Sequence, residues 1–150
     1  MNWCRNARRV RRVAASAIRR KFGRIVNITS GSVKMPLAGL DLSSGARAGL
    51  TAFLAGVARS VAAANVTINF LLPGTFDTDR LRGGIETLAK RAGKDVAEAI
   101  ADRMASVPAR RFGDPAEFGD ACAYLCSAQA GYITGQNLLL DGGGFNSSST

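Results

Sequence analysis

The sequence predicts an α/β domain in which helices cover a parallel sheet. Segments of strand type and helix type alternate along its 150 residues, which is the order of connected βα units. The run 66–72 is apolar almost throughout, as expected of a parallel strand that is buried on both faces. Hydrophobic residues make up 47% of the chain, which is enough for one domain with a core.

The first half predicts two helices with a strand between them. Residues 4–21 have apolar side chains at helical spacing, and Gly23 is expected to end that helix. The β-rich run 24–29 predicts a strand, 31–42 a loop, and 43–64 a second helix. The apolar stripes expected to face the core are Val10, Val13, Ala14, Ile18 and Phe22 in the first helix, and Leu50, Phe53, Leu54, Val57 and Val61 in the second.

The second half predicts three helices and a final strand. The apolar strand stops at Pro73-Gly74, and the more polar stretch 75–112 predicts two short helices. Asp114 fits a helix N-cap, with Pro at the first helical position and a helix that runs to about Ala128. Residues 136–140 predict the last strand. The carboxyl ends of parallel strands share one edge, where ligands bind in such sheets.

The positive charge of the chain is confined to its N-terminal block. Residues 1–24 hold nine Lys and Arg and no Asp or Glu, whereas the other eleven Lys and Arg are balanced by all eleven acidic residues. We interpret 1–22 as a basic helix that is solvated or contacts another subunit, and 23–150 as the α/β domain. A nucleic-acid surface is less favoured because the block, whose aromatic residues are Trp3 and Phe22, has no interleaved platform of rings on which bases could stack. A transit peptide is disfavoured because the block continues into the strand without a linker.

The cysteines and the hydropathy favour a cytoplasmic protein without a metal site. The chain has three Cys and no His, which fits reduced thiols and excludes a Ser-His-Asp site. Cys122 and Cys126 lie one helical turn apart, but two further metal ligands are not visible, so we interpret both as small core residues. No run of about 18 apolar residues could span a membrane.

The spacing of three polar residues identifies a family. Ser30 follows the first strand, Ser43 comes thirteen residues later, and Arg47 follows after four more. This layout resembles the catalytic segment of the short-chain dehydrogenase/reductase family, in which Ser is followed at this spacing by Tyr and then by Lys. The segments 69–78, 111–117 and 132–143 also resemble family motifs, in the family's order. Together they look closest to 3-oxoacyl-(acyl-carrier-protein) reductases.

The resemblance implies a Rossmann-type, doubly wound parallel sheet and NAD(P)-dependent redox chemistry on a carbonyl or alcohol. It covers the C-terminal half of the family's fold, with about three strands and flanking helices. The family's Gly-rich phosphate-binding turn has no counterpart here, since the first glycine is Gly23, and we expect a truncated member. Relatives assemble through surfaces similar to the second helix and last strand, so a homo-oligomer or a partnership with full-length relatives is expected.

The resemblance assigns the catalytic positions to Ser30, Ser43 and Arg47. In the family, the Ser hydrogen-bonds the substrate carbonyl, the Tyr donates the proton, and the Lys lowers the Tyr pKa. Ser43 replaces the Tyr, and an alcohol is far less acidic than a phenol with a pKa near ~10. Arg47 keeps the charge but is a poor proton relay. We therefore expect weak or no activity from the chain alone, or a non-catalytic role in association. Ser30 as a turn cap, and Ser43 or Ser44 as a helix N-cap, remain alternatives.

The resemblance places the nicotinamide end of the cofactor against Pro73, Gly74, Phe76 and Thr78. Gly permits a close backbone approach and Thr can hydrogen-bond a carboxamide. Arg47 could bind ribose or phosphate oxygens. A plain Pro-Gly turn is the alternative reading of this segment. The family's further active-site Asn corresponds to Asn2, or with poorer spacing to Asn6.

Overall fold

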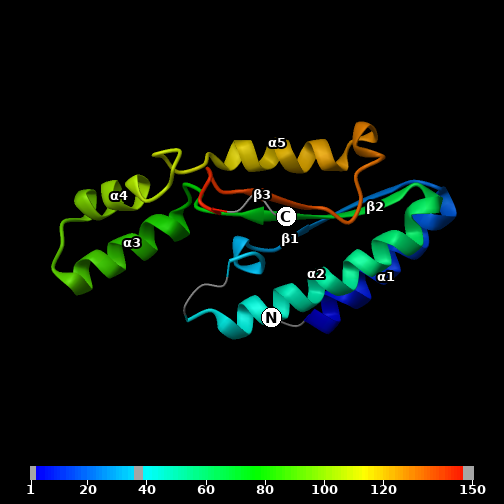
Figure 1. Cartoon of the computed structure of the whole chain (residues 1–150), viewed down its shortest axis with the longest axis horizontal. Coiled ribbons are helices and arrows are strands. Elements are labelled where there is room, and N and C mark those ends of the chain that lie inside the picture. The colour runs from blue at the N-terminus through cyan, green and yellow to red at the C-terminus, as the bar shows by residue number, and fades with distance from the viewer. Residues whose placement is uncertain (1–2, 36–38, 147–150) are drawn as a thin grey trace.

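The computed structural model describes residues 3–35 and 39–146 (Figure 1), so Asn2 lies outside the described residues. The fold class is confirmed: a three-stranded parallel sheet has helices on both faces. The elements in chain order are α1 (Trp3–Arg20), β1 (Gly23–Ile28), α2 (Asp41–Val61), β2 (Val66–Pro73), α3 (Asp79–Ala92), α4 (Val96–Ala105), α5 (Pro115–Cys126) and β3 (Asn137–Leu140).

The sheet has the order β1-β2-β3, and β2 is its buried centre. Gly23 pairs with Val66 at the start of β1, and Phe70 pairs with Asn137 at the start of β3. Figure 1 shows α1 and α2 on one face of the sheet and α5 on the other. Because all strands are parallel, their carboxyl ends meet at one edge.

The core lies between α2 and β2. Leu54 is fully buried and packs in one cluster with Ile68 and Phe70. Leu50 and Val61 are also buried, as predicted, and Val57 packs partly buried against the same cluster. The prediction for Phe53 is wrong, since this side chain is 42% exposed at the margin of the buried stripe.

The predicted apolar stripe of α1 is wrong at three of its five positions, and near Gly23 this helix lies too close to the sheet for large side chains. Val10, Ala14 and Ala17 are buried. A Cβ on Gly23 would lie 2.5 Å from the Ala17 Cβ, so helix and strand meet through small residues. The larger apolar side chains of the predicted stripe are exposed instead: Val13, Ile18 and Phe22.

Two predicted helix boundaries are also wrong. Helix α1 ends at Arg20, and Lys21 adopts the left-handed conformation with a φ of 52°, whereas Gly23 opens β1. Helix α2 begins at Asp41 with Leu40 at the N-cap, so neither Ser43 nor Ser44 caps it. The Asp114 cap of α5 is confirmed, including the reciprocal bond of 2.8 Å that the Asp114 backbone N–H donates to the Glu117 carboxylate.

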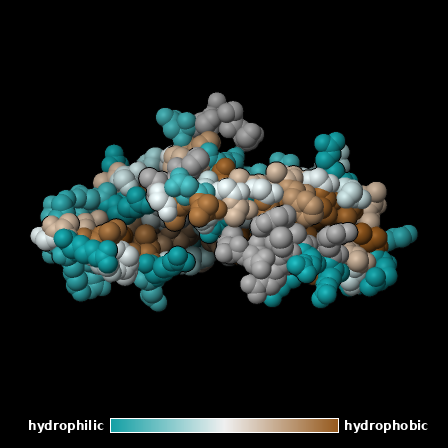
Figure 2. All heavy atoms as spheres, turned by 90° about the horizontal axis from the view of Figure 1, so that it is seen from below, coloured by the Kyte–Doolittle hydropathy of each residue, from teal (hydrophilic) through white to brown (hydrophobic). Residues whose placement is uncertain are grey.

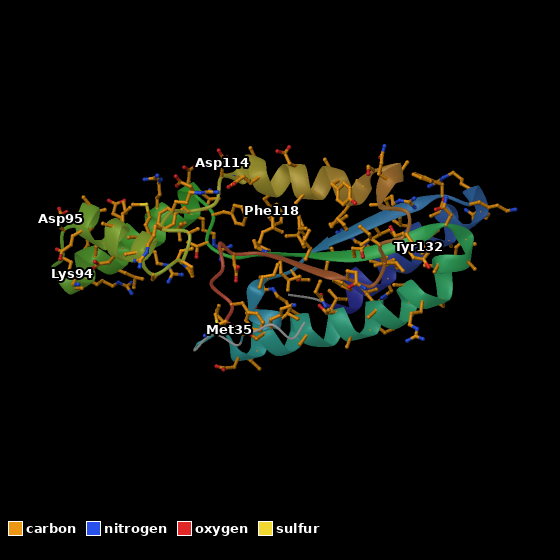
Figure 3. All side chains as sticks on the ribbon, turned by 45° about the horizontal axis from the view of Figure 1, so that its top comes forward. Met35, Lys94, Asp95, Asp114, Phe118 and Tyr132 are labelled. Atoms are coloured by element: carbon orange, nitrogen blue, oxygen red, sulfur yellow. The ribbon has the colours of Figure 1, made fainter. Side chains whose placement is uncertain are left out.

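The two short helices predicted in 75–112 are confirmed as α3 and α4, which form an arm. They pack mainly against each other and lie beyond the carboxyl edge of the sheet (Figure 1). A bridge between Phe76 and Gly113 joins the two stems of the arm. In Figure 3, Lys94 and Asp95 mark the turn at the far end of the arm, and Tyr132 lies at the opposite end of the molecule.

Apolar side chains remain exposed on the α1–α2 side. Figure 2 looks onto this side and shows a brown apolar band along the molecule. The exposed large apolar side chains of these two helices include Val13, Ile18 and Phe53. None of the helices in the described residues is long and apolar enough to cross a membrane.

The interpretation of the two helical cysteines as core residues is wrong for Cys126, which is exposed, while Cys122 is half-buried. Leu125 takes the buried position in this turn of α5 instead. Within the described residues, no group of three or more Cys, Asp or Glu side chains gathers as a metal cluster would require.

Candidate functional site

Ser30 follows β1 directly and shapes the turn there. Its Oγ accepts a hydrogen bond of 3.2 Å from the Ser32 backbone N–H, which caps the short helical turn Gly31–Val33. The turn-cap reading of Ser30 is therefore confirmed. It does not conflict with a functional role, because the hydroxyl proton is left to donate to a ligand.

A cavity of about 260 Å³ lies at the carboxyl edge, where the strands end. Each strand supplies part of its wall, and the α4 end of the arm supplies another part. The polar lining consists of Ser30 and Ser32 after β1, Thr75 after β2, Asp141 after β3, and Arg103 and Ser106 from the arm. Pro73 and Gly74 line the same cavity. The structure thus brings together three of the residues predicted from the sequence.

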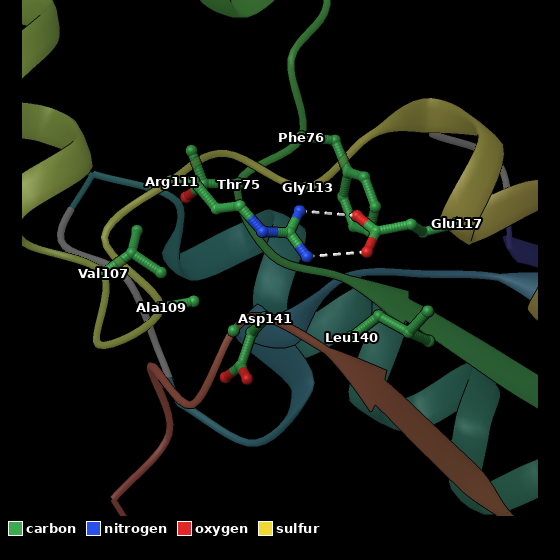
Figure 4. A pocket seen from close by; sticks show the side chains of 10 residues that line it. Thr75, Phe76, Val107, Ala109, Arg111, Gly113, Glu117, Leu140 and Asp141 are labelled. Atoms are coloured by element: carbon green, nitrogen blue, oxygen red, sulfur yellow. Dashed lines mark hydrogen bonds and ion pairs between the residues drawn. The ribbon is translucent and has the colours of Figure 1, made fainter.

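A second hollow of about 240 Å³ adjoins the first, and both are lined by Thr75, Val107 and Asp141 (Figure 4). On its wall, the Arg111 guanidinium donates two bonds of 2.7 Å to the Glu117 carboxylate. This pairing, with a further bond from the Asp114 backbone N–H, lowers the pKa of Glu117 to about 2. Both charges are thus satisfied within the wall.

Phe76 and Thr78 follow β2 but have separate structural roles. Phe76 lines the second hollow and packs edge-on against Phe118, with ring centroids 5.3 Å apart. Figure 3 shows Phe118 pointing from α5 toward the sheet. The Thr78 Oγ1 accepts a 3.2 Å bond from the Leu81 N–H and caps α3. Its hydroxyl proton is not used by that bond.

Ser43 and Arg47 form a pair on α2 that stands apart from the cavity. The Arg47 Nη1 donates to the Ser43 Oγ one turn away. Neither residue lines the two hollows. The structure therefore separates the predicted catalytic positions into Ser30, which lines the cavity, and the Ser43–Arg47 pair, which does not.

Sequence reasoning missed Ser32, Arg103 and Asp141 as cavity residues. Asp141 could have been found, because it ends the last predicted strand and parallel strands share their carboxyl edge. Ser32 could have been found from the same turn as Ser30. Arg103 carries no local signal, because its place depends on how the arm folds back toward Thr75.

These features define an α/β protein with a cavity at the carboxyl edge of a parallel sheet, the edge at which ligands bind in such sheets. Residues 4–144 match the family model described as Enoyl-(Acyl carrier protein) reductase. The curated relatives and the solved structures point the same way. The chain belongs to the short-chain dehydrogenase/reductase family.

Named relatives include nodulation protein G of Azospirillum brasilense, which is 38% identical over 131 residues, or 87% of this chain and 49% of the relative. The 3-oxoacyl-(acyl-carrier-protein) reductase of Vibrio harveyi is 35% identical over the same shares of both chains. Among solved structures, an NADPH-dependent reductase involved in bacilysin biosynthesis superposes with a TM-score of 0.85 and 31% identity, over 92% of this chain and 53% of that one. The chain spans about half the length of the curated relatives it matches.

Proposed function

We propose that the chain is an NAD(P)-dependent oxidoreductase acting on a carbonyl or alcohol. The observation that carries the proposal is Ser30, which lies at the carboxyl edge in one cavity with Pro73 and Gly74. Ser30 donates its free proton to the substrate carbonyl oxygen. The family membership and a relative of 31% identity that is named as an NADPH-dependent reductase support this reading.

The residues after β2 fit the nicotinamide end of the cofactor. Pro73, Gly74 and Thr75 line the edge cavity, and Thr78, further along the same segment, keeps its hydroxyl proton for an acceptor. These groups hold and orient the cofactor, with Arg47 toward its ribose or phosphate oxygens. When bound, the cofactor supplies the hydride.

Proton delivery is the weak step of this proposal. Arg47 donates to the Ser43 oxygen, which favours the negatively charged form of that oxygen. An alcohol nevertheless remains far less acidic than the phenol that the family uses here. Because Ser43 also lies outside the cavity that Ser30 lines, it protonates the product oxygen poorly, and the chain alone turns over weakly or not at all.

The division of the chain is part of the proposal. The proposed units are 1–22, which contains the basic helix α1, and 23–150, a partial NAD(P)-binding Rossmann domain. Helix α1 meets the sheet closely where Ala17 lies against Gly23. A cytoplasmic setting is proposed from the free thiols of Cys122 and Cys126.

Titration with NADPH and NADH tests the proposal, by calorimetry and by the shift of thermal unfolding. We expect saturable micromolar binding and slow oxidation of NADPH by a ketone. The double variant Ser43→Tyr, Arg47→Lys restores the family motif and is expected to raise turnover at least tenfold. Ser44→Ala, on the same turn, is the matched control and leaves turnover unchanged. A folded protein that binds neither cofactor contradicts the proposal.

Association with a second copy, or with a full-length relative, is the second candidate function. Val13, Ile18 and Phe53 expose apolar area on the α1–α2 side, as a surface that pairs with another subunit does. Sedimentation velocity is expected to show a dimer that Phe53→Asp dissociates. Leu88→Asp, on the exposed surface of α3, is the control. A nucleic-acid role for the Arg-rich block is less supported; it requires a salt-sensitive mobility shift that disappears without residues 1–20.

A further inference from the structure

Helix α1 presents a row of arginines to solvent. The exposed arginines that the structure describes on this helix are Arg8, Arg9, Arg12, Arg19 and Arg20. By the helical period, Arg8, Arg12 and Arg19 fall on the side of the helix opposite the buried Ala14 and Ala17. This row therefore points away from the core, where a large partner can reach it.

No carboxylate neutralises the arginine row. Residues 1–24 contain nine Lys and Arg and no Asp or Glu, and the rest of the chain has no net charge. Among the described side chains, the ion pairs all lie between residues 77 and 117. The bond that Arg20 donates to the Ser16 hydroxyl, at 2.6 Å, leaves the charge in place. The formal net charge of +9 is therefore concentrated on α1 and the residues that follow it directly.

Apolar side chains are exposed beside the arginine row. Val13 and Ile18 are exposed between the row and the buried face of the helix, and Phe22 is exposed just after the helix ends. The apolar band in Figure 2 lies on the same side of the molecule. The main apolar face of α1 already packs into the core, so these few groups are the ones that α1 can offer to a partner.

This combination matches an anionic bilayer better than the other partners of a basic helix. Lipid headgroups attract guanidinium groups, and a few apolar side chains can enter the boundary between headgroups and acyl chains. A nucleic acid would use the charge but not the apolar groups, and the Phe22 ring has the Arg24 guanidinium 4.6 Å from its centroid, in the place of a stacked base. A second copy of the chain would match the apolar groups but brings the same positive charge.

We propose that α1 lies on the surface of an anionic bilayer. Its arginine row binds the phosphates and carboxylates of the headgroups, while Val13 and Ile18 enter the headgroup boundary. The apolar contribution is small because the buried face of the helix stays on the core, so the attraction is mainly electrostatic and weakens as salt is added. The inference goes beyond the proposed function and does not depend on cofactor or substrate binding.

Sedimentation of the full chain with sucrose-loaded vesicles tests the inference. Vesicles of phosphatidylcholine and phosphatidylserine in equal parts are compared with vesicles of phosphatidylcholine alone. We expect the chain to sediment with the anionic vesicles, to stay in the supernatant with the neutral ones, and to leave the anionic vesicles as salt is raised.

A pair of charge variants locates the binding surface. Arg12→Gln combined with Arg19→Gln is expected to lower the vesicle partition coefficient about tenfold. Arg80→Gln combined with Arg91→Gln removes the same charge from exposed positions of α3, and this matched control should leave the coefficient nearly unchanged. Because all four side chains are exposed, both variants should unfold at the wild-type temperature.

A second pair of variants tests the apolar contact. Ile18→Ser is expected to weaken binding to the anionic vesicles several-fold and to leave binding to heparin, a soluble polyanion, unchanged. Leu88→Ser, at an exposed apolar side chain of α3, is the control and should change neither.

Equal sedimentation with neutral and anionic vesicles overturns the inference, as does an Arg12→Gln, Arg19→Gln variant that binds like its control. Tighter binding of duplex DNA than of anionic vesicles, with no effect of Ile18→Ser on either, assigns the row to a nucleic acid instead. A dimer that stays off the vesicles assigns the surface to a second copy. NADPH binding is measured separately, so failure of this inference and failure of the proposed function are distinguishable.

Discussion

Replacing Gly74 by Ala tests the contact between the carboxyl ends of β2 and β3. The Gly74 N–H donates to the Leu140 carbonyl at 2.8 Å. A Cβ on Gly74 would lie 2.5 Å from the Asp141 Cβ and 2.6 Å from its Cα, whereas ordinary contacts begin at 3.4 Å. These atoms belong to the backbone or its first side-chain carbon, so no side-chain rotation relieves the overlap, and the strand ends must separate by about 1 Å.

Overpacking of this size costs about 1–3 kcal/mol, and we take ~2 kcal/mol as the expected loss. For a domain of 150 residues, a loss of that size lowers the unfolding midpoint by about 4–8 °C. Circular dichroism during heating measures the midpoint. Gly119→Ala on α5 is the control, because its Cβ meets nothing within 4 Å, and it is expected to gain up to ~1 kcal/mol. A Gly74→Ala protein that melts with the wild type refutes the reasoning.

Three further predictions concern the core, an ion pair and a helix cap. Leu54→Ala removes a fully buried side chain and should lower the free energy of unfolding by about 2–5 kcal/mol. Leu42→Ala, at a side chain that is 93% exposed, should change that free energy by less than ~0.5 kcal/mol. Urea titration measures both variants, and equal losses of stability would contradict the assigned core. The pKa of Glu117 is lowered to about 2 from an ordinary 4.5, so its contribution to stability is complete above pH 4.5 and is lost as the pH falls toward 2. Over this pH window the midpoint temperature of thermal unfolding should fall more steeply for the wild type than for Glu117→Gln. Parallel plots of midpoint against pH would rule out the ion pair as the cause. Asp95→Ala deletes the acceptor of a 3.0 Å bond from the Glu98 N–H and should weaken the start of α4 by ~1 kcal/mol; unaltered NMR chemical shifts there would show that the cap is dispensable.

The fold was predictable where a local pattern of residues is enough to indicate the element. The strand 66–72 is apolar on both faces, and Asp114 with Pro115 marks a helix start that needs no tertiary information. The α1 stripe was not predictable in the same way. Its buried face is chosen by the close approach of Ala17 to Gly23, and periodicity alone favours the larger side chains of Val13 and Ile18.

In the candidate site, too, some residues were predictable from local patterns and others are placed only by tertiary packing. Ser30, Pro73 and Gly74 were predictable because parallel strands end at one edge and because the family motif places them there. Arg103 enters the cavity only through the path of the arm. Ser43 and Arg47 lie on α2 outside the hollows, and their place depends on how that helix packs against the sheet, which the sequence pattern does not state.

The arm formed by α3 and α4 has a consequence for cooperativity. Its helices pack mainly on each other, and its stems are tied by two backbone bonds at Gly113, to Asp77 and Thr75, of 2.9 and 3.0 Å. A unit with so few bonds to the rest of the domain unfolds locally at a lower free energy than the sheet does. Its amide protons therefore exchange with solvent through partial unfolding, whereas those of β2 exchange only through global unfolding. Because Arg103 and Ser106 belong to the arm side of the cavity wall, each partial opening also removes that wall, and the rate of arm opening sets an upper limit on how long any occupant of the cavity stays enclosed.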